Sequence, residues 1–163
     1  MSINGFYPIS LASILVLAWQ HSLKPPAVLI LLAVVWANVA IHELGHVAVV
    51  RCTGGRVIGV TIKPWHGMTT LRQEHRLAFA VTALAGPAAG LVAGGAALFV
   101  LGQLSSPWVV TAIGVSLHAV LWAGICDNAL NLLPVGVLDG NQFVKALREW
   151  RVHATVLAEL FVP

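Results

Sequence analysis

The sequence contains little charge. Of its 163 residues, only 9% are Asp, Glu, Lys or Arg, and 58% are hydrophobic. A soluble globular domain usually carries about 25% charged residues, so this composition argues against such a domain and indicates a membrane protein. The length suits one compact domain of a few helices. The net charge is only +3, and no stretch forms a dense basic cluster, which argues against nucleic acid as a partner.

Cysteine is equally scarce. The only two cysteines are Cys52 and Cys126, and their spacing matches no disulfide framework. We therefore expect two unpaired thiols. The N-terminal residues lack the basic start and the small-residue cleavage site of a signal peptide. We expect the first apolar run to be retained as a membrane segment.

Four apolar runs are candidates for membrane helices, and they cover 6–20, 27–50, 77–101 and 108–133. A span needs about 20 residues, or about 17 at the low end, so the first run is marginal. The predicted fold is an all-α polytopic membrane protein with about four transmembrane helices. We expect residues 1–163 to form a single membrane-embedded domain.

Two further segments complete this predicted fold. Residues 56–72 alternate in polarity and are rich in β-branched side chains, which predicts a small β-hairpin at the membrane surface. Residues 140–163 mix charged and apolar side chains, as is typical of an amphipathic helix at the interface.

The positive charges predict an orientation. Of the nine Lys and Arg residues, five lie in 51–76 and three in 145–151, and the ninth is Lys24. If the third and fourth runs span the membrane, the first two groups lie on one side of it. Because Lys and Arg are enriched in cytoplasmic loops, we expect the hairpin and the tail to face the cytoplasm.

A polar cluster interrupts the second apolar run. His42 and His46 are four residues apart, so a helix places both imidazoles on one face. This H-E-x-x-H pattern is typical of zinc peptidases, in which the two histidines bind Zn²⁺ and the glutamate acts as general base. Ionisable groups at membrane depth are costly and are functional candidates by default. Counted back from Arg51, the two histidines lie roughly 8–14 Å below the cytoplasmic end of the helix.

A catalytic zinc site usually has three protein ligands and one open position. The sequence has only six acidic residues. If Glu43 is the base and those in the loop and the tail are set aside, Asp127 and Asp139 remain. Asp139 follows the helix break at Pro134, and irregular backbone at membrane depth is tolerated where it lines a buried cavity. The alternative third ligand is Glu74, in a membrane-anchored peptidase that acts on soluble peptides.

Two motifs together resemble those of the site-2 protease family, the intramembrane zinc metalloproteases of peptidase family M50. The first is HELGH at 42–46. The second is NLLPVGVLDG at 131–140, which matches N-x-x-P-x-x-x-x-D-G in register, and AGPAAG at 85–90 is similar to the family's Gly-Pro segment. The resemblance covers residues 27–145. Asn141 and Gly90 depart from residues common in the family, and no PDZ or CBS module is present in these residues, so we expect a minimal form.

The resemblance implies roles for individual residues. His42, His46 and Asp139 would bind one Zn²⁺ ion, and Glu43 would be the catalytic base. Asn131 would place the substrate or stabilise the intermediate, and Asn128 is a further substrate-binding candidate. Asp127 lies four residues before Asn131 on the same helical face. Its carboxylate would either support a ligating histidine or bind a neighbouring helix.

The predicted function is zinc-dependent hydrolysis of peptide bonds within or near the transmembrane segments of membrane proteins. The expected partners are such a substrate, the lipid bilayer and a regulatory membrane protein. The expected location is a prokaryotic cell membrane, with the active site nearer the cytoplasmic face. The free edge of the hairpin would accept an unwound substrate as an added strand. The alternative function is a catalytically silent scaffold or binding protein that keeps the fold.

Overall fold

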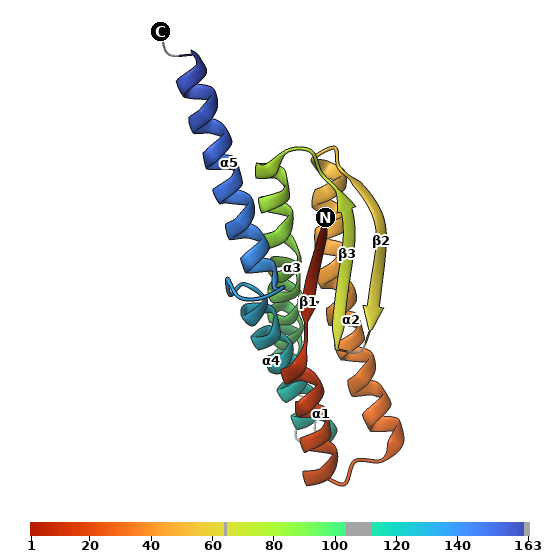
Figure 1. Cartoon of the computed structure of the whole chain (residues 1–163). Helices are drawn as coiled ribbons and strands as arrows, with labels where there is room; N and C mark the ends of the chain where they lie inside the picture. The colour runs from red at the N-terminus through yellow and green to blue at the C-terminus, as the bar shows by residue number, and fades with distance from the viewer. Residues whose placement is uncertain (64, 104–111, 162–163) are drawn as a thin grey trace.

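The computed structural model describes residues 1–63, 65–103 and 112–161. Helices dominate this part of the chain, together with one small sheet (Figure 1). The elements follow one another in the order β1 (Ser2–Phe6), α1 (Pro8–Gln20), α2 (Pro25–Cys52), β2 (Arg56–Lys63), β3 (His66–Arg72), α3 (Arg76–Gln103), α4 (Ala112–Asn131) and α5 (Asp139–Phe161).

Helices α2 and α3 form the centre of the fold. Each has 28 residues, and both are long and apolar enough to cross a membrane. Helix α2 begins at Pro25, where the fixed φ of proline suits the first turn. Gly45 faces α3, and a Cβ there would lie 2.5 Å from the carbonyl oxygen of Ala85. The missing side chain allows the two helices to pack closely, as is common for helices in lipid.

The predicted four-span arrangement is reproduced in part. Among the described residues, α2 and α3 meet the length and hydropathy of a span, whereas α1 is a shorter apolar helix. The helix expected from residue 6 begins at Pro8, because residues 2–6 are taken up by a strand and proline favours the first helical position. Residues 108–111 of the predicted fourth segment lie outside the described residues, and α4 begins at Ala112.

The predicted hairpin is confirmed as β2 and β3. These strands are antiparallel, and β1 pairs with the other edge of β3, so the sheet has the order β1-β3-β2. Ile3 lies opposite Thr69, and Gly5 lies opposite Gly67. The sequence prediction missed β1, because five residues with a central Asn-Gly pair carry little strand signal.

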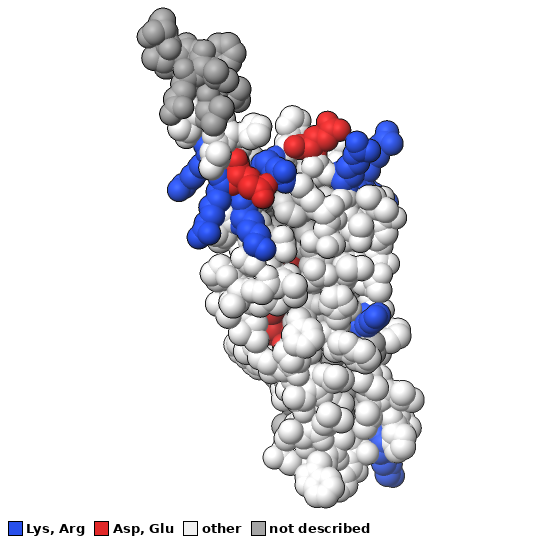
Figure 2. All heavy atoms as spheres, viewed as in Figure 1, with Lys and Arg blue, Asp and Glu red and all other residues white. Residues whose placement is uncertain are grey.

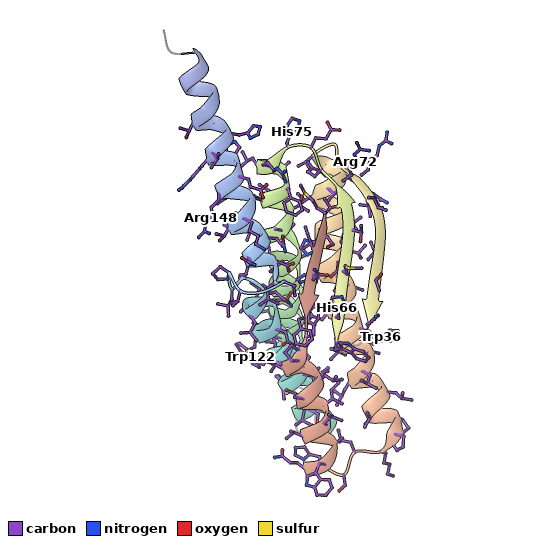
Figure 3. The ribbon with its side chains drawn as sticks, viewed as in Figure 1. Trp36, His66, Arg72, His75, Trp122 and Arg148 are labelled. Atoms are coloured by element: carbon purple, nitrogen blue, oxygen red, sulfur yellow. The ribbon has the colours of Figure 1, made fainter. Side chains whose placement is uncertain are left out.

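The sheet lies along the C-terminal half of α2. Strand β3 runs from His66, at the level of Trp36, to Arg72, which lies near His75 (Figure 3). Side chains alternate between the two faces of a strand, and every second residue of β3 (Gly67, Thr69 and Leu71) is buried. The buried face of the sheet therefore covers the helical turns that carry the H-E-x-x-H motif.

Helix α5 packs against α3. Its Ala146 is buried, with Phe143 and Leu147 partly buried beside it, and Arg76 forms an ion pair with Glu149 at 2.9 Å. The Lys and Arg side chains on the visible face gather mainly at this end of the molecule, and the opposite end is almost uncharged (Figure 2). The helix predicted for the tail is thus present from Asp139 onwards, and residues 162–163 lie outside the described residues. Both cysteines are free, as predicted, and both are exposed.

Candidate metal centre

Helix α2 presents His42, Glu43 and His46 on the side that faces the rest of the protein. All three side chains are fully buried. The imidazoles meet edge to face, with their Nε2 atoms 3.1 Å apart. This follows from the i, i+4 spacing predicted from the sequence.

Asp139 completes the group from the first residue of α5. Its Oδ2 lies 2.9 Å from His42 Nε2 and 3.7 Å from His46 Nε2, and all three residues are fully buried. One ligand atom from each residue lies within 4.8 Å of the others. Gly140 allows this placement, because a Cβ there would overlap with the carbonyl group of Leu132.

The other nitrogen of each histidine has a partner. His46 Nδ1 lies 2.7 Å from the carbonyl oxygen of Thr82 on α3, so it donates its proton there. His42 Nδ1 lies 2.8 Å from the amide oxygen of Asn128 on α4. When Nδ1 carries the proton, the lone pair of Nε2 is free to bind a metal. Both histidines therefore direct a ligand atom toward Asp139.

These atoms fit a metal ion such as zinc. Two imidazole nitrogens and one carboxylate oxygen are a usual catalytic zinc set. Neither oxygen of Asp139 has a hydrogen-bond partner among the described residues, although both are buried. Three converging lone-pair atoms in a buried space repel one another unless a cation or a proton lies between them, and a metal ion satisfies all three.

Glu43 is held beside this group without belonging to it. Its Oε2 accepts a hydrogen bond from Thr69 Oγ1 at 2.5 Å, whereas Oε1 is buried and has no partner in the described part of the chain. Strand β3 lies directly over this carboxylate, because a Cβ at Gly67 would overlap with Oε1. One oxygen of Glu43 is thus fixed, and the other is available to accept a proton.

Strand β1 covers the same centre. A Cβ at Gly5 would lie 2.9 Å from His42 Nε2 and 3.0 Å from the hydroxyl oxygen of Tyr7, so these two atoms border one small space. The Tyr7 ring packs edge-on against His42 at 5.5 Å between ring centroids, and its hydroxyl has no hydrogen-bond partner among the described residues. A phenol is protonated at neutral pH, so this hydroxyl is a hydrogen-bond donor.

The remaining predicted site residues lie around this centre. Asn131 accepts a hydrogen bond from the Phe6 amide at 3.0 Å and donates to the Phe6 carbonyl at 3.2 Å. Asp127 accepts hydrogen bonds from the amides of Ile9 and Ser10 at 3.0 and 2.8 Å. Of its two predicted roles, the structure thus shows binding to a neighbouring helix, at the N-terminus of α1.

Glu74, the alternative third ligand, is exposed and lines a hollow beside Thr53 and Gly55, at the end of α2. In the described part of the chain, the acidic residue that joins the histidines is Asp139. The positions of Thr69 and Tyr7 beside this centre were not predicted, because no local pattern marks a threonine or a tyrosine as a neighbour of residues far away along the chain.

A comparison with models of known protein families gives one match. The family model described as Peptidase M50B-like matches residues 9–162. The chain belongs to the peptidase M50B-like family. No curated protein and no solved structure gives a significant match. Membership of the M50 family implies a membrane metalloprotease, in agreement with the two candidate spans and the buried group of two histidines and an aspartate.

Proposed function

We propose that this protein is a zinc-dependent intramembrane endopeptidase that cleaves membrane proteins within or near their transmembrane segments. One observation carries the proposal. The fully buried His42 and His46 lie on a helix that is apolar enough to cross a membrane, and Asp139 of α5 converges with them. Beside them lies Oε1 of Glu43, which has no hydrogen-bond partner in the described part of the chain. We further propose a multi-pass protein of a prokaryotic cell membrane, with the charged end of Figure 2 toward the cytoplasm.

The chemistry follows from the atoms around the centre. Zinc held by His42, His46 and Asp139 would supply a Lewis acid that lowers the pKa of water to about 7 and polarises a carbonyl group. Glu43 accepts the proton of the attacking water at Oε1 and later delivers it to the leaving amine. Thr69 fixes the other oxygen of Glu43 during both transfers. The Tyr7 hydroxyl donates to the substrate carbonyl oxygen as that oxygen gains negative charge.

We propose a different place for the substrate strand than the free edge of the hairpin. An added strand at the outer edge of β2 would lie two strand spacings from β3, about 10 Å, whereas Glu43 contacts β3 itself. On the other side of the sheet, β1 pairs with β3, and the flanking residues Met1 and Tyr7 continue this pairing through backbone hydrogen bonds to Leu71 and Trp65. The N–H and C=O groups of Phe6 point outward to the Asn131 amide. We therefore expect the substrate to enter between β1 and α4 and to take over the hydrogen bonds of Asn131.

The test compares cells that express the wild-type chain with cells that express the Glu43→Gln variant. N-terminal mass spectrometry of membrane proteins should find new termini within transmembrane segments only with the wild type. Identical fragments from both, with zinc bound to both, would contradict a protease and favour a scaffold or binding protein.

A further inference from the structure

A buried amide on α4 contacts one of the two histidines of the candidate metal centre. Asn128 is fully buried, and its oxygen lies 2.8 Å from His42 Nδ1. The predicted substrate-binding role of Asn128 would require an amide that is free to meet a substrate. Each end of this amide instead has partners within the protein.

The orientation of the Asn128 amide is set from its nitrogen. The nitrogen donates to the carbonyl oxygen of Gly124 at 2.8 Å and to the amide oxygen of Asn38 at 3.2 Å. Both partners are acceptors in this arrangement, so the –NH₂ group must face them and the amide oxygen must face His42. An oxygen at this place can only accept, so it requires the proton of His42 on Nδ1.

Gly90 on α3 provides the space for this arrangement. A Cβ at Gly90 would overlap with the oxygen, carbon and nitrogen of the Asn128 side-chain amide. The amide thus fits between Gly90 on one side and His42 on the other. An alanine at position 90 would push the amide away from the histidine, because the overlap involves the whole amide group.

We propose that Asn128 is a positioning residue that fixes the tautomer and the ring orientation of His42. Gly90 contributes by leaving the space that the Asn128 amide occupies. The inference rests on the metal-binding part of the proposed function. In this proposal Asn128, predicted from the sequence to bind the substrate, instead affects the metal indirectly through His42. Groups that orient a ligating histidine typically change metal affinity by about 10- to 100-fold when they are removed.

The experiment measures the zinc affinity of the full-length protein in detergent by competition with a chromophoric chelator. We expect Asn128→Ala and Gly90→Ala each to weaken zinc binding by about 10- to 100-fold. The matched control is Gly95→Ala on the same helix, where a Cβ would meet nothing within 4 Å. This control should bind zinc like the wild type.

A double-mutant cycle separates the proposed mechanism from general damage. If Gly90→Ala acts by displacing the Asn128 amide, it should have no further effect in the Asn128→Ala background, because the two changes remove the same interaction. Additive losses would overturn the pairing of the two residues. The visible absorption of bound Co²⁺ reports the ligand geometry, and both single variants should change it, whereas destabilisation elsewhere should not.

Two outcomes would overturn the proposal. One is an Asn128→Ala variant that binds zinc and cobalt like the wild type, and a raised KM in that variant would restore its substrate-binding role. The other is a wild type that binds no zinc, in which case the proposed function fails as well. Equal zinc affinity in the wild type and in all variants would overturn the inference and leave the proposed function intact.

Discussion

Asp127 is predicted to stabilise the fold by capping α1. Its carboxylate is fully buried and accepts hydrogen bonds from the backbone amides of Ile9 and Ser10. These amides belong to the first turn of α1, where backbone donors have no partner within the helix and the helix dipole is positive. The Asp127→Ala variant would leave the buried amide of Ser10 and the partly buried amide of Ile9 without this acceptor.

The magnitude follows from the two lost bonds. A buried donor left without its partner costs about 1–3 kcal/mol, and hydrogen bonds measured inside a membrane protein average about 0.6 kcal/mol. Between these limits, we expect Asp127→Ala to lower the free energy of unfolding by about 2–4 kcal/mol. For a chain of this length, that corresponds to a fall in Tm of about 4–16 °C.

The assay is thermal unfolding in detergent, followed by tryptophan fluorescence, with zinc content measured on the same samples. The control is Glu74→Ala, which removes an exposed carboxylate. We expect Asp127→Ala to unfold earlier and still to bind zinc at low temperature, because its carboxylate contacts α1 and not a ligand. An unchanged Tm together with lost zinc would refute this reasoning and would show that Asp127 acts on a histidine.

Three further predictions test the centre. Asp139→Ala should abolish zinc binding measured by elemental analysis, whereas Glu74→Ala should keep it, and the reverse result would mean that the ligand set is wrong. Tyr7→Phe should lower kcat by about 100-fold, as expected for a lost oxyanion donor, with zinc content unchanged, and an equal kcat would remove the hydroxyl from the mechanism. Thr69→Val should lower kcat by about 10- to 100-fold because Glu43 loses a hydrogen bond to a charged group. Thr69→Ser should recover most of that rate, and failure of this rescue would point to lost packing rather than to the hydrogen bond.

The sequence predicted those parts of the site that depend on local spacing. The i, i+4 histidines require only a helix to meet, and the hairpin follows from alternation and a turn. Asp139 was identified through its motif and lies beside the histidines, as the resemblance implies. Each of these predictions concerns one element or one motif, so it does not depend on how distant elements pack together.

The parts that the sequence did not predict depend on packing between distant elements. Asn131 meets Phe6 across 125 residues, and Thr69 meets Glu43 across 26 residues. Asn128 was expected to contact a substrate, but its hydrogen bonds lie within the protein. Side chains of the same type bind substrates, cap helices or orient ligands, so residue type alone does not distinguish these roles. Pro8 was the one local signal that marked the true start of α1.

The burial of the centre has a consequence for turnover. The side chains of His42, Glu43, His46 and Asp139 are all inaccessible in this conformation, so a substrate can reach them only after the protein opens. Each 1.4 kcal/mol that favours the closed form lowers the open fraction about tenfold and weakens apparent substrate affinity by the same factor. The two hydrogen bonds between Asn131 and Phe6 contribute to that preference. Under the proposed function, selectivity would reside in the opening equilibrium: a segment that unwinds easily and replaces those two bonds would be cleaved, and a stable transmembrane helix would remain intact.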